Sequence, residues 1–555
     1  MKNRISFFLF IGFLLSLVSC GTSKSMHHQP EISGYNAQKP IVKKISDSVF
    51  TSGKNSLLKN KQGLWELYAE GDPLEIGLNT GALTDSLLKK QQQIFFSKIT
   101  DLIPSNFEQK MLRHFLKWYN RKLYLNVPEE YQTEIFGVSE YTSHEFDNIA
   151  SKYQRGLYLH AAHDIGHALQ DLALVGCSSF AAWNEKSEDG SLILGRNFDF
   201  YVNDAFAENK IVAFINPKEG HKFMMITWPG MIGAVSGMNQ EGLTITINAS
   251  KSKIPLIAKT PISILTREIL QHAATIDEAV AIAKKRKVFV SESIMVGSAN
   301  DNKAVLIEVS PKKMDVYDVS NNNELICSNH FQGDAFKYDK RNQAQIANSH
   351  SEYRFERMQE LLSENPKVNP KIASEILRNK NGLKDIPLGY GSEKALNQLM
   401  AHHGIIFKPK EKLVWVSANP YQLGEFVCYN LDTVFNNRKT DTLVSFQLEN
   451  LNIAKDPFLE TTAYENYKKF RIEDHKIDAL LEKKESISAA FIQNYQSLNP
   501  DYWVVYYKPG LYFYQIKDFN QAKLNFEKAL TKEITTAPEK EKIEKYLKKI
   551  KRKLQ

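Results

Sequence analysis

The chain has 555 residues, of which 43% are hydrophobic and 11% aromatic, which is enough apolar material for a large folded core. The net charge of +8 is small for this length and gathers near the C-terminus, in residues 540–553, so we expect no nucleic-acid partner. Four cysteines do not make a disulfide framework, and no phosphate loop or nucleotide fingerprint is present, so we expect no cofactor. Length alone predicts about two to four domains.

Residues 1–19 have the features of a lipoprotein signal peptide. A basic start precedes an apolar run over 5–18 that is too short to span a membrane. The run leads into Leu-Val-Ser-Cys-Gly over 17–21, which resembles a bacterial lipobox with Cys20 as the lipidated residue. A plain signal peptide with an incidental cysteine is the alternative. We expect a protein of the bacterial cell envelope, anchored through Cys20 to the outer membrane or at a periplasmic membrane face, with 20–45 as a polar tether.

Residues 46–176 are expected to form a helical N-terminal segment, a propeptide or separate chain after processing. Apolar residues recur with a helical period over 87–102 and 107–123. Three histidines share one face of a later helix: His160, His163 and His167. That spacing could bind zinc, but Asp164 is the only close carboxylate. We therefore expect no metal and interpret this helix as packing near the mouth of the active site.

Cys177 is the candidate nucleophile. It follows Gly176 at the start of a run of small residues, and a turn near 188–190 leads back to Arg196 and Asp199. A cut between Gly176 and Cys177 would free an α-amine, whose pKa of about 7.7–8.0 suits a general base on the same residue. Glycine allows an unusual backbone at the cleavage site. The alternative for Cys177 is a buried core thiol.

Arg196 and Asp199 are expected to act on that cysteine. Residues three apart on a strand point to opposite faces, so a turn or bulge must bring both side chains to one site. Arg196 can lower the pKa of a nearby thiol, and Asp199 can accept a hydrogen bond from the new amine. The alternative is a structural ion pair beside a hairpin.

Three further segments contain candidate site residues. Residues 237–248 predict a strand, a tight turn and a second strand that ends at Asn248. Asn329 stands in a Cys-Ser-Asn-His-Phe run beside His330, which is a rival general base. Arg354 stands in a Ser-Glu-Tyr-Arg-Phe run, where a solvated arginine at a helix start is the alternative.

These motifs, in this order, resemble the acyl-CoA:6-aminopenicillanate acyltransferase family (peptidase C45) of N-terminal-nucleophile hydrolases. Choloylglycine hydrolase and acid ceramidase are more distant relatives. The resemblance also includes the Gly-Asp-Pro-Leu-Glu-Ile-Gly run over 71–77 and the segment over 128–137, and it covers about 65–431.

The resemblance implies an α+β fold, a four-layer αββα sandwich of two antiparallel sheets with helices outside. It implies self-cleavage before Cys177 and attack on an amide bond other than an ordinary peptide. It also implies that Asn248 and Asn329 hold the oxyanion and that Arg354 supports the site.

The predicted elements divide the chain further. Alternating strands are expected at 211–214, 222–228, 305–309 and 412–417, and helices at 261–283 and 354–363.

We place a catalytic domain at 177–431, a linker at 432–457 and a small all-α appendage at 458–555. In the appendage, residues 503–530 have spacings that resemble one tetratricopeptide helix-turn-helix, without its closing proline.

We therefore expect an autoprocessed cysteine enzyme that hydrolyses a small N-acyl substrate or transfers its acyl group to an amine. Both outcomes remain open. The competing interpretation is a non-catalytic lipoprotein scaffold that binds a protein partner through its C-terminal helices. The complete set of one cysteine, one aspartate, arginines and two asparagines argues against a decayed site.

Overall fold

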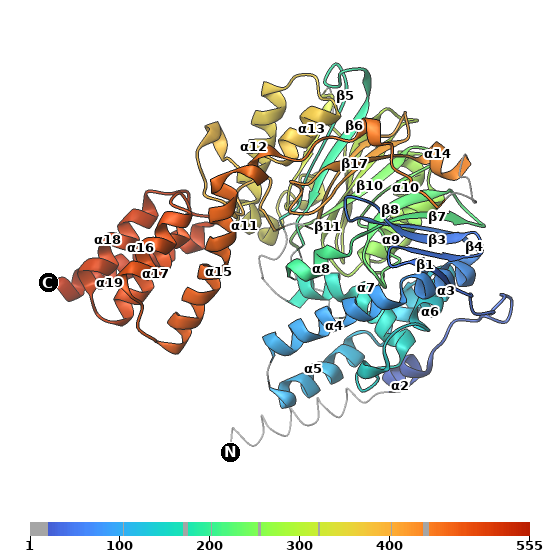
Figure 1. The fold of residues 1–555 in the computed structure, drawn as a ribbon, viewed down its shortest axis with the longest axis horizontal. Helices are drawn as coiled ribbons and strands as arrows, with labels where there is room; N and C mark the ends of the chain where they lie inside the picture. Colours follow the sequence, from blue (N-terminus) through green and yellow to red (C-terminus); the bar gives the residue numbers. More distant parts are fainter. Residues whose placement is uncertain are drawn as a thin grey trace.

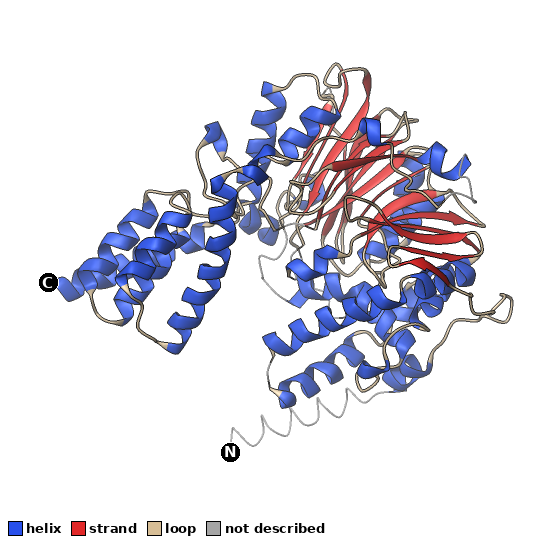
Figure 2. Ribbon diagram, in the orientation of Figure 1, coloured by secondary structure: helices blue, strands red, loops and turns tan. Residues whose placement is uncertain are grey.

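Two β-sheets lie face to face at the centre of the protein, and helices cover their outer faces (Figures 1 and 2). The computed structural model describes residues 20–103, 105–169, 176–200, 203–252, 257–319, 322–400, 402–436 and 443–555. The predicted signal peptide lies outside the described residues. None of the helices in these ranges is long and apolar enough to cross a membrane.

The described strands form one sheet of eleven strands and one of six. In spatial order the first sheet is β1 (Lys43–Ser46), β2 (Val49–Ser52), β3 (Asn55–Lys59), β4 (Trp65–Gly71), β7 (Ile211–Pro217), β8 (Phe223–Thr227), β9 (Ser236–Asn239), β10 (Leu243–Ala249), β11 (Glu292–Ser298), β12 (Lys303–Val309) and β13 (Met314–Tyr317). The second is β14 (Glu324–Cys327), β5 (Ser178–Asn184), β6 (Gly190–Phe198), β15 (His403–Lys408), β16 (Leu413–Ser417) and β17 (Phe426–Asn430). The predicted strands are confirmed: 211–214 and 305–309 lie within β7 and β12, whereas 222–228 and 412–417 extend slightly beyond β8 and β16.

Buried apolar side chains fill three successive layers, which fixes the αββα order. Between the sheets, Leu194 packs with Phe214 and Met295. The helices on the outer face of the first sheet are α3 (Pro73–Leu83), α4 (Asp85–Leu102), α5 (Asn106–Tyr119), α6 (Glu129–Ser139), α7 (Lys152–Leu169), α9 (Ile262–His272) and α10 (Ile276–Lys285). Over the second sheet lie α12 (Ser351–Glu364) and α13 (Pro370–Leu377), where Met358 packs against Ile406. The predicted four-layer sandwich is confirmed.

The first part of the chain differs from the predicted helical segment over 46–176. Residues 43–71 form β1 to β4, and within the predicted segment the first helix begins at Pro73. β1 to β3 have only four or five residues each, and β3 and β4 are buried in continuous runs, so their alternation is weak. β4 is secured by parallel pairing of Trp65 with Ile211, far along the chain.

The predicted tether is docked in part: α2 (Cys20–His27) lies against α7, where Gln154 Nε2 donates to the Ser25 carbonyl (2.7 Å). The predicted helix over 261–283 is two helices, because Ala273 is extended and Thr275 caps α10. The hydroxyl of Thr275 accepts a hydrogen bond from the backbone of Glu278.

The last part of the chain is a helical unit with its own hydrophobic core, at the side of the sandwich (Figure 1). Its helices are α15 (Thr462–Lys483), α16 (Ala489–Leu498), α17 (Val504–Gln515), α18 (Phe519–Leu530) and α19 (Ala537–Leu554). The predicted helix-turn-helix over 503–530 corresponds to α17 and α18, and Gly510 lies against the ring of Phe526. Its likeness to a tetratricopeptide unit stays a prediction.

Candidate active site

Cys177 directly precedes β5, at the end of the sandwich where β6, β10 and β14 also end. Its side chain has no exposed surface in this intact chain. The N–H of Gly176 donates to the Asp199 carbonyl (3.2 Å), which fixes the backbone before the cysteine. Burial raises the pKa of the Cys177 thiol to about 11, and the Arg196 guanidinium opposes that rise.

Arg196 lies beside the thiol, as predicted. On β6 it pairs with Ser179 of β5, and its Nη2 is 3.7 Å from the Cys177 sulfur. The buried guanidinium donates to the Val235 carbonyl (3.0 Å) and also to the Ile247 carbonyl and the Ser236 hydroxyl. These fixed acceptors hold a positive charge at the sulfur.

Asp199 follows the last residue of β6, so the chain leaves the strand between Arg196 and Asp199, as the spacing required. Its Oδ1 accepts a hydrogen bond from Gln422 Nε2 (3.2 Å), and its buried Oδ2 has no hydrogen-bond partner among the described residues. Burial raises the pKa of Asp199 to about 7, although Arg354 and Arg196 oppose the shift. A carboxyl with this pKa can both accept and return a proton near neutral pH.

Arg354, on the first turn of α12, reaches the Gly176–Cys177 bond, where cleavage is predicted. Its Nη1 donates to the carbonyls of Gly176 (2.9 Å) and Cys177 (2.6 Å), and to the Ser178 hydroxyl (2.8 Å). Its Nη2 donates to Asn329 Oδ1 (2.6 Å). The side chain is fully buried, so the solvated alternative is excluded.

Asn248 and Asn329 lie at the same end of the sandwich, but their side-chain N–H groups donate to backbone carbonyls away from the Gly176–Cys177 bond. Asn248 Nδ2 donates to the carbonyls of Cys327 (3.1 Å) and Ser328 (3.2 Å). Asn329 Nδ2 donates to the Ala249 carbonyl (2.8 Å). In the intact chain both amides therefore bridge the two sheets, and their oxyanion role stays a prediction.

Gln398 is a site residue that the sequence did not indicate. It lies in the loop before β15, and its Nε2 donates to the Gly176 carbonyl (2.9 Å). A Cβ added to Gly176 would lie 2.1 Å from that nitrogen. Glycine is thus needed at this position for close approach of Gln398, and not for the unusual backbone that we expected, because Gly176 is not among the positive-φ glycines of the described chain.

Two buried histidines extend the site behind Arg196. The Ser236 hydroxyl accepts from Arg196, so its own hydrogen goes to His403 Nε2 (2.9 Å). His403 must then carry its hydrogen on Nδ1, which donates to His402 Nδ1 (2.9 Å). Burial lowers the pKa of both rings well below the usual value, so the pair is neutral. Neither histidine was singled out from the sequence; their adjacency at the start of β15 is the signal that could have indicated this series of hydrogen bonds.

His160 and His330 bond to groups other than Cys177. His160 bonds the Gly156 carbonyl through Nδ1 (2.7 Å) and accepts the Ile232 N–H at Nε2 (2.9 Å). The side chains of His163 and His167 lie outside the described residues, and no group of three or more metal-type ligands occurs in the rest. His330 Nδ1 bonds the Ser351 hydroxyl (2.9 Å), and burial lowers the pKa of His330 to about 4.

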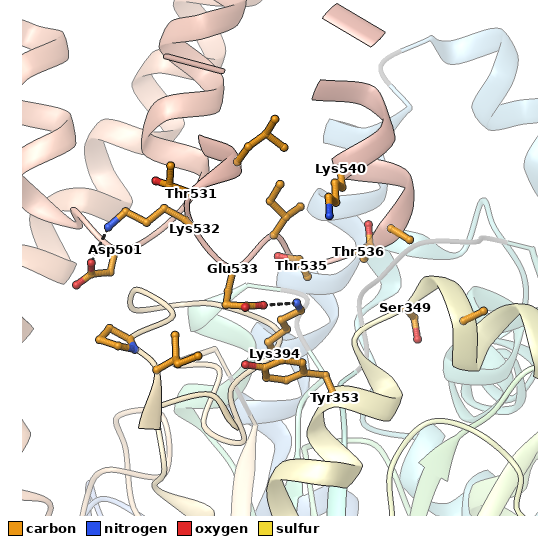
Figure 3. A pocket seen from close by; sticks show the side chains of 16 residues that line it. Ser349, Tyr353, Lys394, Asp501, Thr531, Lys532, Glu533, Thr535, Thr536 and Lys540 are labelled. Carbon is orange, nitrogen blue, oxygen red and sulfur yellow. Dashed lines mark hydrogen bonds and ion pairs between the residues drawn. The ribbon is translucent and has the colours of Figure 1, made fainter. Parts of the chain in front are cut away.

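A pocket of about 680 Å³ lies between the start of α12 and the turn before α19 (Figure 3). Lys394 faces Glu533 across it, and Lys532 pairs with Asp501. Its lining includes Tyr353 but none of the residues that contact Cys177. We therefore place the active site by its chemistry and not by this hollow.

Residues 183–419 match the acyl-coenzyme A:6-aminopenicillanic acid acyl-transferase family. The predicted resemblance is confirmed. The match begins after Cys177 and includes Arg196, Asp199, Arg354 and Gln398.

Curated relatives are distant. An uncharacterized protein of Archaeoglobus fulgidus is 26% identical over 46% of this chain and 45% of its own length. The N-acylethanolamine-hydrolyzing acid amidase of Caenorhabditis elegans is 25% identical over 36% of this chain and 56% of its own. The chain thus spans about half the length of these relatives. A solved Caenorhabditis elegans ortholog of that amidase aligns with 42% of this chain and 93% of its own, at 20% identity and a TM-score of 0.32.

Proposed function

We propose that the protein is a cysteine N-terminal-nucleophile enzyme that cleaves itself before Cys177 and then acts on the amide bond of a small N-acyl substrate. One observation supports this most: two buried arginines converge on the Gly176–Cys177 bond. Arg196 lies 3.7 Å from the sulfur, and Arg354 lies 2.9 Å from the Gly176 oxygen. A purely structural ion pair between Arg196 and Asp199 would require neither of these two contacts.

Cleavage turns the Cys177 nitrogen into an α-amine on the same residue as the thiol. The amine takes the thiol proton, and Arg196 stabilises the thiolate. The sulfur attacks the substrate carbonyl carbon, the C–N bond breaks, and the leaving amine takes the proton back. The thioester is then resolved by water, which gives hydrolysis, or by a second amine, which gives acyl transfer.

The substrate class rests on similarity and on the surroundings of the sulfur. The matching family is named for an acyl transfer, and the Caenorhabditis elegans relative is named for hydrolysis of N-acylethanolamines. Cys177 belongs to an apolar cluster with Phe198 and Ile247, which supports a hydrocarbon acyl group beside the sulfur.

Purified protein assayed against N-acylethanolamines, N-acyl amino acids, bile-acid conjugates and penicillins tests this function. We expect release of the free acid, or of a new amide when a second amine is added, and no reaction with Cys177→Ala, which removes the nucleophile. Turnover by Cys177→Ala would contradict the assignment.

We also propose that a lipid on Cys20 holds the enzyme at a bacterial membrane. The signal-like residues before Cys20 support this. The chain docks on α7 by Ser25, so the anchor would keep the folded body close to the lipid surface.

A further inference from the structure

The carbonyl oxygen of Gly176 receives two buried hydrogen-bond donors. Arg354 Nη1 and Gln398 Nε2 each lie 2.9 Å from it. The two side chains are 0% and 1% exposed, so water does not compete for the oxygen. An ordinary backbone carbonyl needs one partner, whereas two fixed donors, one of them charged, suit an oxygen that becomes an anion.

We propose that Arg354 and Gln398 form the oxyanion hole for cleavage of the Gly176–Cys177 bond, with Gln398 as a catalytic residue. This rests on the self-cleavage in the proposed function. Each donor already lies 2.9 Å from the ground-state carbonyl oxygen, which is the atom that would become the oxyanion.

The step balances with the groups at hand. Asp199 takes the proton of the Cys177 thiol while the sulfur bonds to the Gly176 carbonyl carbon, and the negative oxygen stays between Arg354 and Gln398. The C–N bond then breaks, and the nitrogen takes the proton from Asp199 to become the amine. Water hydrolyses the resulting thioester, which leaves a Gly176 carboxylate and the Cys177 thiol.

This assignment explains why the residue before Cys177 is glycine. A Cβ at Gly176 would lie 2.1 Å from Gln398 Nε2 and 2.6 Å from its Oε1, both far below van der Waals contact. Any other residue would displace the amide from the carbonyl. The hydrogen bond from Gln398 to the carbonyl thus depends on glycine at position 176.

The C-terminal helices hold the loop that carries this donor. The next residue, Leu399, has a left-handed φ of 51°, which costs energy for a non-glycine residue. Two contacts fix it: its N–H donates to Asn397 Oδ1 (3.0 Å), and its carbonyl accepts from the Tyr467 hydroxyl of α15 (3.0 Å). Leu399 also packs in the core of the C-terminal helices, which gives that unit a role in maturation.

The test is the rate at which newly synthesised full-length chain splits, followed by electrophoresis after cell-free translation. Gln398→Met keeps the length of the side chain and removes the donor, and we expect a loss of about 10²–10³-fold. Gly176→Ala should lose a similar factor, and the double variant should lose little more, because both changes disable one contact.

Gln154→Met is the matched control, because Gln154 is equally buried (1%) and donates to a backbone carbonyl, that of Ser25. It should split at the wild-type rate. If circular dichroism shows that Gln398→Met does not fold, Gln398→Asn replaces it, because the shorter side chain moves the amide donor away from the Gly176 carbonyl.

The outcomes separate the two claims. Two results overturn the oxyanion assignment alone. In one, the wild type and the Gln398 variants split equally fast. In the other, the rate losses of Gln398→Met and Gly176→Ala multiply in the double variant. A wild type that stays intact overturns self-cleavage and this assignment together.

Discussion

Asp199→Asn tests the proposed proton transfer of self-cleavage, because it removes the proposed base and keeps the size of the side chain. The asparagine Oδ1 can still accept the hydrogen bond from Gln422. A positioned general base contributes about 10²–10⁴-fold, so self-cleavage should slow by that factor.

The same group sets the pH dependence of cleavage. Burial raises the pKa of Asp199 to about 7, and the ionised form is the one that accepts the thiol proton. Cleavage should therefore be level above that pKa and fall about tenfold for each pH unit below it. An aspartate with its ordinary pKa would keep full activity down to a pH of about 4.

Pulse-labelled full-length chain, moved into buffers of increasing pH, gives this profile directly. The Asn variant should be slow and should lose the break near neutral pH. Glu66→Gln is the control, because Glu66 is a buried carboxyl whose pKa is also raised, and it bonds to Asn60 and Tyr429. A wild-type rate in Asp199→Asn, or a profile without the break, would refute the reasoning.

Three further predictions have distinct expected results. Asn329→Ala releases Arg354 Nη2 and should lower turnover about 10²–10³-fold. His330→Ala, once shown to be folded and processed, should retain most turnover, because burial lowers the pKa of His330 to about 4. Steady-state rates that reverse this order would make His330 the base. His403→Leu should raise the midpoint of Cys177 thiolate formation by about one pH unit, whereas His403→Gln, which keeps an acceptor for the Ser236 hydroxyl, should not. Thiolate absorbance, measured against Cys177→Ser, reports both midpoints. Equal midpoints in the two variants would show that His403 does not position Arg196. Cys20→Ser should abolish lipid labelling and release the protein from the membrane fraction, and unchanged membrane association would indicate another anchor.

The sequence predicted those parts of the site that lie on one local pattern. Cys177, Arg196 and Asp199 belong to one hairpin, and the turn that brings them together is readable from its spacing. The strand pair that ends at Asn248 follows from alternation around a turn in which Gly242 has a positive φ (79°).

Other parts depend on contacts between distant segments, which leave no local pattern. Gln398 is 222 positions from the carbonyl it bonds, and His403 is 167 positions from Ser236. The strands β1 to β4 join the first sheet through parallel pairing with β7, so the helical interpretation of residues 46–176 missed them.

The most direct test of the central claim is intact-mass and N-terminal sequence analysis of the purified, active enzyme. We expect two polypeptides, the second beginning at Cys177, and a single chain without amidase activity for Cys177→Ala. An active wild type that remains one uncut chain would contradict an N-terminal nucleophile.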